Sequence, residues 1–148
     1  MLSVVKSLAL QGLDGRILSI EVDISCGLPC FEIVGLPDTS IKEAKERVKT
    51  AIRNTGVEFL SRRIVVNLAP ADIRKEGASL DLPIALGILI ASGEIENNYL
   101  NTFLEESIFV GELSLDGSVE KIKQASKEEL MEVKGITEKI VEQIKNRD

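Results

Sequence analysis

The sequence predicts an α/β domain, of the α+β kind, in which helices pack on a mixed β-sheet. Three observations favour this class: alternating apolar runs, two helix-length apolar segments, and the order of strands and helices along the chain. That order is three strands, a helix, a strand, a helix and a strand pair, which does not give a purely doubly wound sheet. With 148 residues and 44% hydrophobic residues, the chain can build one ordinary core.

The first three strands are expected before residue 35. Residues 4–10 are rich in β-forming side chains, and Asp14-Gly15 predicts a tight turn after them. Residues 17–24 alternate apolar with polar side chains, which is typical of a half-buried antiparallel strand. Residues 31–34 predict a third strand. The buried face of the second strand would consist of Leu18, Ile20, Val22 and Ile24.

The first helix is expected to begin at a capping box, Ser40-Ile41-Lys42-Glu43, and to end before Gly56. Its apolar stripe consists of Ile41, Ala44, Val48, Ala51 and Ile52. The opposite face is charged, and such a face is usually only solvated. A local basic patch is the alternative, and its members would be Lys49, Arg53, Arg62 and Arg63.

A central strand and an apolar helix complete the predicted core. Residues 64–68 form a nearly continuous β-forming run, which suits a strand with neighbours on both sides. The helix is expected to have Asp81 as its N-cap, with Pro83 in the first turn, and to end near residues 92–93.

The rest of the body is predicted to be a surface connection and a last strand pair. Residues 94–106 are acidic and rich in Asn, as surface connections are. Residues 108–115 predict a strand, and Asp116-Gly117 predicts a turn toward Val119.

Composition excludes several kinds of site. Aromatic residues make up 3% of the chain, so we expect an aliphatic core and no base-stacking surface of the kind that binds single strands. Two cysteines, Cys26 and Cys30, without any histidine are too few for a four-ligand zinc site, so we expect no metal and no cofactor. Reduced thiols, no signal peptide and no membrane-length apolar segment predict a cytoplasmic protein without a membrane partner.

Three motifs carry a resemblance to a known family: FEIVGLPDTSIKEAKERVKTAIRNTGVEF, RRIVVNLAPADIRKEGASLDLPIALGILIASG and FVGELSLDG. Over residues 2–119 the chain closely resembles the front domain of the ComM/YifB proteins, which are magnesium-chelatase-like ATPases. The resemblance implies the ribosomal S5 domain 2-like fold in its Lon-protease-like version.

The ATPase chemistry of that family is not expected here. In the family, the front domain is followed by an AAA+ module with a G-x-x-x-x-G-K-[ST] loop that cradles phosphates. No such stretch occurs in the 148 residues, and Lys134-Gly135 has the order reversed. We therefore expect no ATP binding or hydrolysis by that route.

A different pattern begins after Val119. Residues 1–120 contain 11 Lys and Arg against 18 Asp and Glu, whereas residues 121–148 contain 7 against 6. Residues 125–147 resemble a helix-hairpin-helix of the kind found at the C-terminus of the UvrC repair nuclease subunit. The predicted domains are therefore 1–120 and 121–148.

This hairpin is the predicted DNA-binding site. Backbone N–H groups at the start of its second helix could cradle one phosphate without reading sequence, and lysines would add attraction. The expected contacts are Lys134, Gly135, Ile136, Thr137, Lys139 and Lys145. Thr137 stands where such hairpins commonly have a second glycine. Packing against the body and dimerisation are the alternatives, and acidic residues such as Glu138 oppose phosphate binding.

Ser79 raises the question of catalysis. Lon-like proteases use a Ser–Lys dyad whose serine lies in a Gly-x-Ser stretch, which Gly77-Ala78-Ser79 matches in outline. Lys121 and Lys123 are the candidate bases. However, a carboxylate from Asp81 at the helix N-terminus would oppose an oxyanion there. The resemblance also implies that ComM-type relatives keep the fold without the dyad. We therefore expect Ser79 to be a loop residue that leads into the helix.

The sequence thus predicts a non-catalytic protein that binds DNA weakly and without sequence preference through the hairpin. One alternative is an interaction module that associates with itself or with a separate AAA+ ATPase. The other alternative is a Lon-like serine peptidase that uses Ser79.

Overall fold

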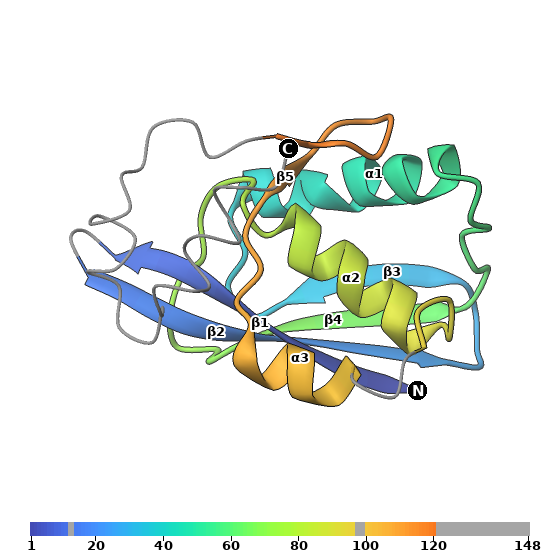
Figure 1. Cartoon of the computed structure of the whole chain (residues 1–148). Helices are drawn as coiled ribbons and strands as arrows, with labels where there is room; N and C mark the ends of the chain where they lie inside the picture. Colours follow the sequence, from blue (N-terminus) through green and yellow to red (C-terminus); the bar gives the residue numbers. More distant parts are fainter. Residues whose placement is uncertain (12–13, 97–99, 121–148) are drawn as a thin grey trace.

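A mixed four-stranded sheet forms the base of the structure, a computed structural model that describes residues 1–11, 14–96 and 100–120 (Figure 1). Its strands lie in the order β1 (Leu2–Gln11), β2 (Asp14–Ser25), β4 (Arg63–Ala69) and β3 (Cys30–Val34). Strand β2 pairs antiparallel with β1 and with β4, whereas β3 pairs parallel with β4. The predicted α/β class with a mixed sheet is confirmed. The hairpin predicted in residues 121–148 lies outside the described residues.

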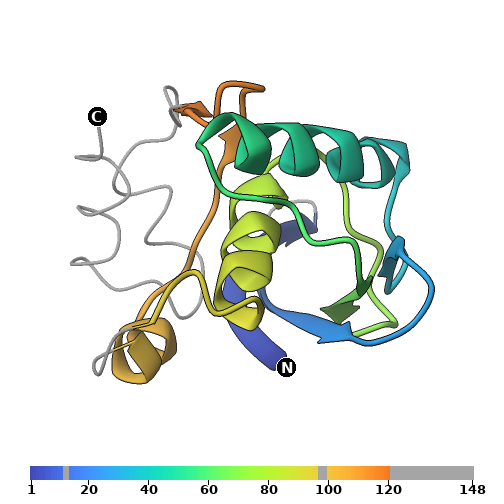
Figure 2. The same cartoon turned by 90° about the vertical axis from the view of Figure 1, so that its right-hand side faces the viewer.

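Two helices cover one face of this sheet and close the core. Helix α2 (Asp81–Ala91) packs on β1 and β2, and helix α1 (Thr39–Asn54) packs beside α2 and toward β3 (Figures 1 and 2). The apolar stripe predicted for α1 is its buried face, and the predicted face of β2 is buried as well. Strand β4 lies between β2 and β3, so the predicted central strand is confirmed.

The hairpin between β1 and β2 differs from the prediction. Gln11 pairs with Asp14 and Leu10 pairs with Gly15, so the Asp-Gly pair lies inside the ladder and the predicted turn there is wrong. The connection is made by residues 12–13, which lie outside the described residues. The register buries alternate side chains of both strands, and this long-range requirement overrides the local turn preference of Asp-Gly.

Helix α1 begins two residues earlier than the predicted capping box implies. Its N-cap is Asp38, whose Oδ1 accepts from the backbone N–H of Ile41 at 2.8 Å, so the cap predicted at Ser40 is wrong. The second oxygen of Asp38 accepts from the N–H of Gly77 at 3.0 Å. The two oxygens of one carboxylate therefore cap the helix and hold the loop that follows β4. Gly56 follows the helix end with φ +89°, as predicted.

Helix α2 also begins differently. Leu80 occupies the N-cap position without a side-chain cap, and Asp81 is the first helical residue, so the cap predicted at Asp81 is wrong. The Asp81 carboxylate is buried and accepts from Arg47 of α1, at 2.8 Å from Nε and 3.1 Å from Nη2. It also accepts from the N–H of Leu113 at 3.2 Å. The partner of the Asp81 carboxylate is therefore the distant Arg47 and not the backbone N–H groups at the start of α2.

The segment after α2 contains a helix that was not predicted, and its predicted strand is shorter than expected. A short helix, α3 (Leu100–Glu106), lies within the predicted surface connection and packs against β1. The strand predicted over residues 108–115 is reduced to β5 (Glu112–Leu113), which pairs with β6 (Val119–Glu120). The Asp116-Gly117 turn lies between them as predicted, with the N–H of Ser118 donating to Asp116. None of the helices in the described part of the chain is both long and apolar enough to cross a membrane.

Arg47→Met is expected to lower the free energy of unfolding by about 3–5 kcal/mol, because it leaves the buried Asp81 carboxylate without its ion-pair partner. Urea denaturation followed by circular dichroism would measure the change. The double variant Arg47→Met/Asp81→Leu should recover most of the loss, since two apolar side chains then replace the pair. A single variant as stable as the parent would show that the pair contributes nothing.

Candidate functional site

Ser79 lies in the turn that precedes α2 and is half-buried. Its carbonyl oxygen accepts from the N–H of Gly111 at 2.8 Å, which ties the turn to the chain segment leading into β5. The candidate bases Lys121 and Lys123 lie outside the described residues. Among the described residues, no hydrogen bond joins the Ser79 hydroxyl to a lysine.

Lys75 is a buried cation that the sequence reasoning did not single out. Its side chain is fully buried, and its Nζ donates to the carbonyls of Gly35, at 2.7 Å, and of Pro70. Burial lowers the pKa of Lys75, with a smaller opposing effect from the charge of Asp72. The charged residues on either side of Lys75 in the sequence give no sign that it is buried, because its partners are backbone carbonyls.

The Lys75 backbone completes a clamp between two loops. Its N–H donates to Leu36 at 3.1 Å, and its carbonyl accepts from the N–H of Asp38 at 3.0 Å. The loop that follows β4 is therefore fixed to the loop that follows β3. The ammonium of Lys75 serves this clamp, which is a structural use of a buried lysine.

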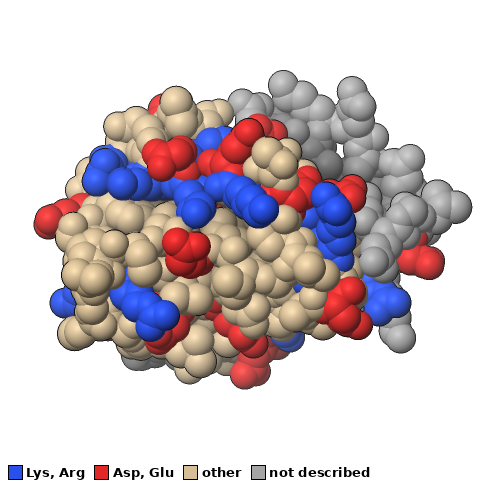
Figure 3. Space-filling view, turned by 180° about the vertical axis from the view of Figure 1, so that it is seen from behind, with Lys and Arg blue, Asp and Glu red and all other residues tan. Residues whose placement is uncertain are grey.

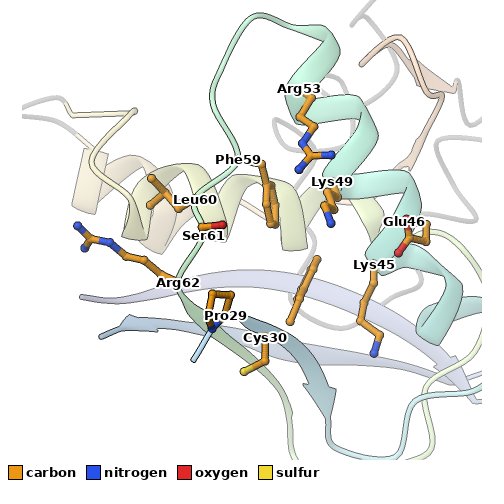
Figure 4. Close-up of a pocket in the computed structure, with 11 residues that line it drawn as sticks. Pro29, Cys30, Lys45, Glu46, Lys49, Arg53, Phe59, Leu60, Ser61 and Arg62 are labelled. Carbon is orange, nitrogen blue, oxygen red and sulfur yellow. The ribbon is translucent and has the colours of Figure 1, made fainter. Parts of the chain in front are cut away.

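A pocket of about 310 Å³ lies on another part of the surface, between the outer face of α1, the start of β3 and the segment that leads into β4 (Figure 4). It is lined by Pro29, Cys30, Phe31, Lys45, Glu46, Lys49, Arg53, Phe59, Leu60, Ser61 and Arg62. Four of these side chains are cationic and one is anionic, on a chain whose net charge is −6. The pocket is therefore a local reversal of the charge of the molecule.

The structure brings together most of the basic patch suggested by the sequence. Lys49, Arg53 and Arg62 line the pocket, and Lys45 joins them from the preceding turn of α1. Arg63 is not among the lining residues and begins β4 instead. In the space-filling view, Lys and Arg side chains form a row over α1 with acidic side chains beside it (Figure 3).

Two aromatic rings lie among these cations. The ring centroids of Phe31, on β3, and Phe59 are 5.8 Å apart, with the rings tilted by 35°. The Nζ of Lys49 lies 6.0 Å from the centroid of Phe59. The sequence reasoning missed this pairing because the two phenylalanines are far apart in the chain. The low aromatic content had argued against any stacking surface.

Other predicted site residues cannot be placed. Lys134, Gly135, Ile136, Thr137, Lys139 and Lys145 all lie outside the described residues, so the DNA-binding hairpin stays a prediction, as does the domain boundary at residue 120. Within the described ranges, Cys, Asp and Glu side chains form no group of three or more that could hold a metal ion.

Comparisons with known proteins give a consistent result. The family model described as subunit ChlI of Mg-chelatase matches residues 20–146. The chain is 44% identical over 124 residues to the protein YifB of Escherichia coli K12, covering 84% of this chain and 24% of that protein. It is 45% identical over 118 residues to the competence protein ComM of Haemophilus influenzae, covering 80% of this chain and 22% of that one. The chain thus spans about a quarter of the length of these curated relatives.

Lys75→Met is expected to lower the free energy of unfolding by about 1–3 kcal/mol, because two buried carbonyls lose their donor. The parent should also gain stability relative to the variant as the pH rises toward 10.5, the ordinary pKa of lysine. The reason is that the lowered pKa leaves fewer protons on the folded parent than on its unfolded chain in that range. Denaturation of both proteins at pH 7 and at higher pH would measure this. A stability difference that shrinks with pH would contradict the assignment.

Proposed function

Because the chain belongs to the ComM/YifB family of magnesium-chelatase-like proteins, we propose that it is a non-catalytic binding domain that holds DNA weakly and without reading base sequence. The observation that carries the proposal is the cationic pocket beside α1. Phosphate groups are the anions that such a surface would meet along a nucleic-acid strand, and contacts to phosphates carry no sequence information.

The arrangement of the cations supports a polymeric anion. Lys42, Lys45, Lys49 and Arg53 follow one another at spacings of three or four residues, which places them along one side of α1. At the rise of an α-helix, this row is about 16 Å long. It is therefore long enough to meet several successive phosphates of one strand.

The hairpin predicted in residues 121–148 would provide a second contact. Each contact alone would be weak, because few charges are involved and salt would screen them. Two weak contacts on one strand reinforce each other, since the first raises the effective concentration of the second.

Two contacts support the non-catalytic part of the proposal. The ammonium of Lys75, the buried lysine nearest to Ser79 in sequence, is already held by the carbonyls of Gly35 and Pro70. The carboxylate of Asp81, two residues after Ser79, is likewise engaged, since it is paired with Arg47. A Ser79 peptidase would thus need a base from elsewhere.

A second candidate function is a protein-interaction module that associates with itself or with a separate AAA+ ATPase. The side chains of Val4 and Val34 lie at the two ends of one cross-strand row, with Glu21 and Asn67 between them, on the face of the sheet opposite α1 and α2. Each is 45% exposed, and Leu2 on the same face is 64% exposed. Exposed apolar side chains around a polar centre would suit a protein partner on this face.

The double variant Lys45→Glu/Lys49→Glu should weaken binding of a duplex oligonucleotide at low salt by about tenfold or more and reduce the salt slope by about two, because two phosphate contacts are lost. Fluorescence anisotropy at several salt concentrations would measure this. Arg16→Glu/Arg74→Glu is the matched control, since it reverses two exposed charges that do not line the pocket. Equal losses in both proteins, or no binding by the parent, would contradict the proposal. Lys134→Glu/Lys139→Glu would test the hairpin in the same way.

Ser79→Ala should leave the protein unchanged in every assay of peptide cleavage, because the parent is expected to cleave neither casein nor a fluorogenic peptide. Incubation of both proteins with these substrates would measure this. Cleavage by the parent that the Ser79→Ala variant abolishes would establish the peptidase alternative and end the non-catalytic assignment.

A further inference from the structure

We propose that the pocket beside α1 receives one unpaired base of a nucleic-acid strand, with Phe59 as its stacking surface. The domain would then prefer single-stranded to duplex nucleic acid. This inference rests on the proposed nucleic-acid binding and adds to it the form of the strand and the group that is recognised.

The pocket combines a flat aromatic ring with cations on several sides. Phe59 and Lys49 reach toward the same space, with Arg53 above them and Lys45 below (Figure 4). A nucleotide has the complementary form, since it is a flat aromatic base with a phosphate on either side. A surface built only for phosphates would not need the ring.

The Phe59 ring has a mobile cation and a second ring as its neighbours. The ammonium of Lys49 lies 6.0 Å from the Phe59 centroid, and Phe31 lies on another side of Phe59 at a centroid distance of 5.8 Å. A lysine side chain has many rotamers, so Lys49 can move from the ring to a phosphate while a base takes its place. Phe31 belongs to β3, packs against the core as Phe59 does, and also lines the pocket, so the two rings together form its aromatic wall.

The size of the pocket suits a single base. A volume of about 310 Å³ is at the lower end of the range for small-molecule sites. It has room for one planar base, whereas the bases of a duplex are stacked and paired inside the helix and cannot enter. The single carboxylate in the lining, Glu46, is exposed on α1. A free mononucleotide has the same chemistry as one unit of a strand, but it would leave the rest of the cationic row on α1 without a partner.

The low aromatic content of the chain does not oppose this site. An extended stacking platform needs an aromatic residue for each base, which five aromatic residues in 148 do not provide. One base needs one ring, and the fold brings two of the five together at this pocket.

The test compares Phe59→Leu with the parent, using the full chain and fluorescence anisotropy. The probes are an oligothymidine and a duplex of the same length. Phe59→Leu should weaken binding of the single strand by about 5- to 100-fold, the range measured for loss of one stacked base, and leave duplex binding and the salt slope unchanged. Phe103→Leu is the matched control, because Phe103 is an exposed ring of α3 that contacts Phe109 instead of the pocket.

If Phe59→Leu does not fold, the same inference can be tested on the parent protein with a strand that lacks bases. A strand of abasic sites has the same phosphates without bases, and the parent should bind it more weakly than the oligothymidine. Equal affinity for the two strands, or equal effects of Phe59→Leu on single strand and duplex, would overturn the inference. The proposed function would still stand if Lys45→Glu/Lys49→Glu weakens both. Failure of the parent to bind any strand would overturn the proposed function itself.

Two competitors distinguish the other possible ligands. Thymidine monophosphate should displace the oligothymidine only at far higher concentration than an unlabelled strand does. Comparable displacement would show that the site serves a free nucleotide. Polyglutamate should compete poorly, because it offers carboxylates without an aromatic ring. Displacement as effective as that by the strand would identify an acidic protein segment as the ligand and overturn the inference.

Discussion

The ion pair between Arg47 and Asp81 is the interaction on which the arrangement of the helices depends. The Asp81 carboxylate is 1% exposed, and it accepts both from Arg47 on α1 and from the N–H of Leu113 on β5. Arg47 also donates to the carbonyl of Ser40, and its hydrogen bond to Asp81 raises its pKa further. One carboxylate thus fixes α1, α2 and β5 relative to one another. Because α1 is fixed, the cations on its outer face have a defined place above β3 and Phe59.

The sequence predicted those parts of the fold that depend on local periodicity. The alternation in β2 and the apolar stripe of α1 follow from spacing alone, and the structure buries both as expected. The helix starts could not be predicted, because each depends on a residue far away. Asp38, not Ser40, caps α1, and its carboxylate also accepts from the distant N–H of Gly77. Asp81 does not cap α2, because its carboxylate pairs with Arg47. In the first hairpin, the burial pattern of two whole strands determined the register and displaced the local Asp-Gly signal.

Some residues of the candidate site could likewise be predicted from local spacing, and others could not. The spacing of the cations on α1 predicts that they share one face of a helix. Arg62 was predicted to join them, and it lines the same pocket. The pairing of Phe31 with Phe59 depends on β3 lying beside β4 and could not be read from the sequence. Lys75 shows the opposite case, since a lysine in a polar loop gives no sign that it will be buried as a clamp between backbone carbonyls. Composition described the average surface of the chain and therefore missed a pocket that differs from that average.

The walls of the pocket belong to α1, to β3 and to the segment that leads into β4, and all three pack on a single hydrophobic core. Such a site has its walls arranged on the core before a ligand arrives, so little ordering entropy is lost on binding. It also exists only while the whole domain is folded. Occupancy would therefore shift the global unfolding equilibrium by mass action, and a bound strand would raise the melting temperature of the entire domain together.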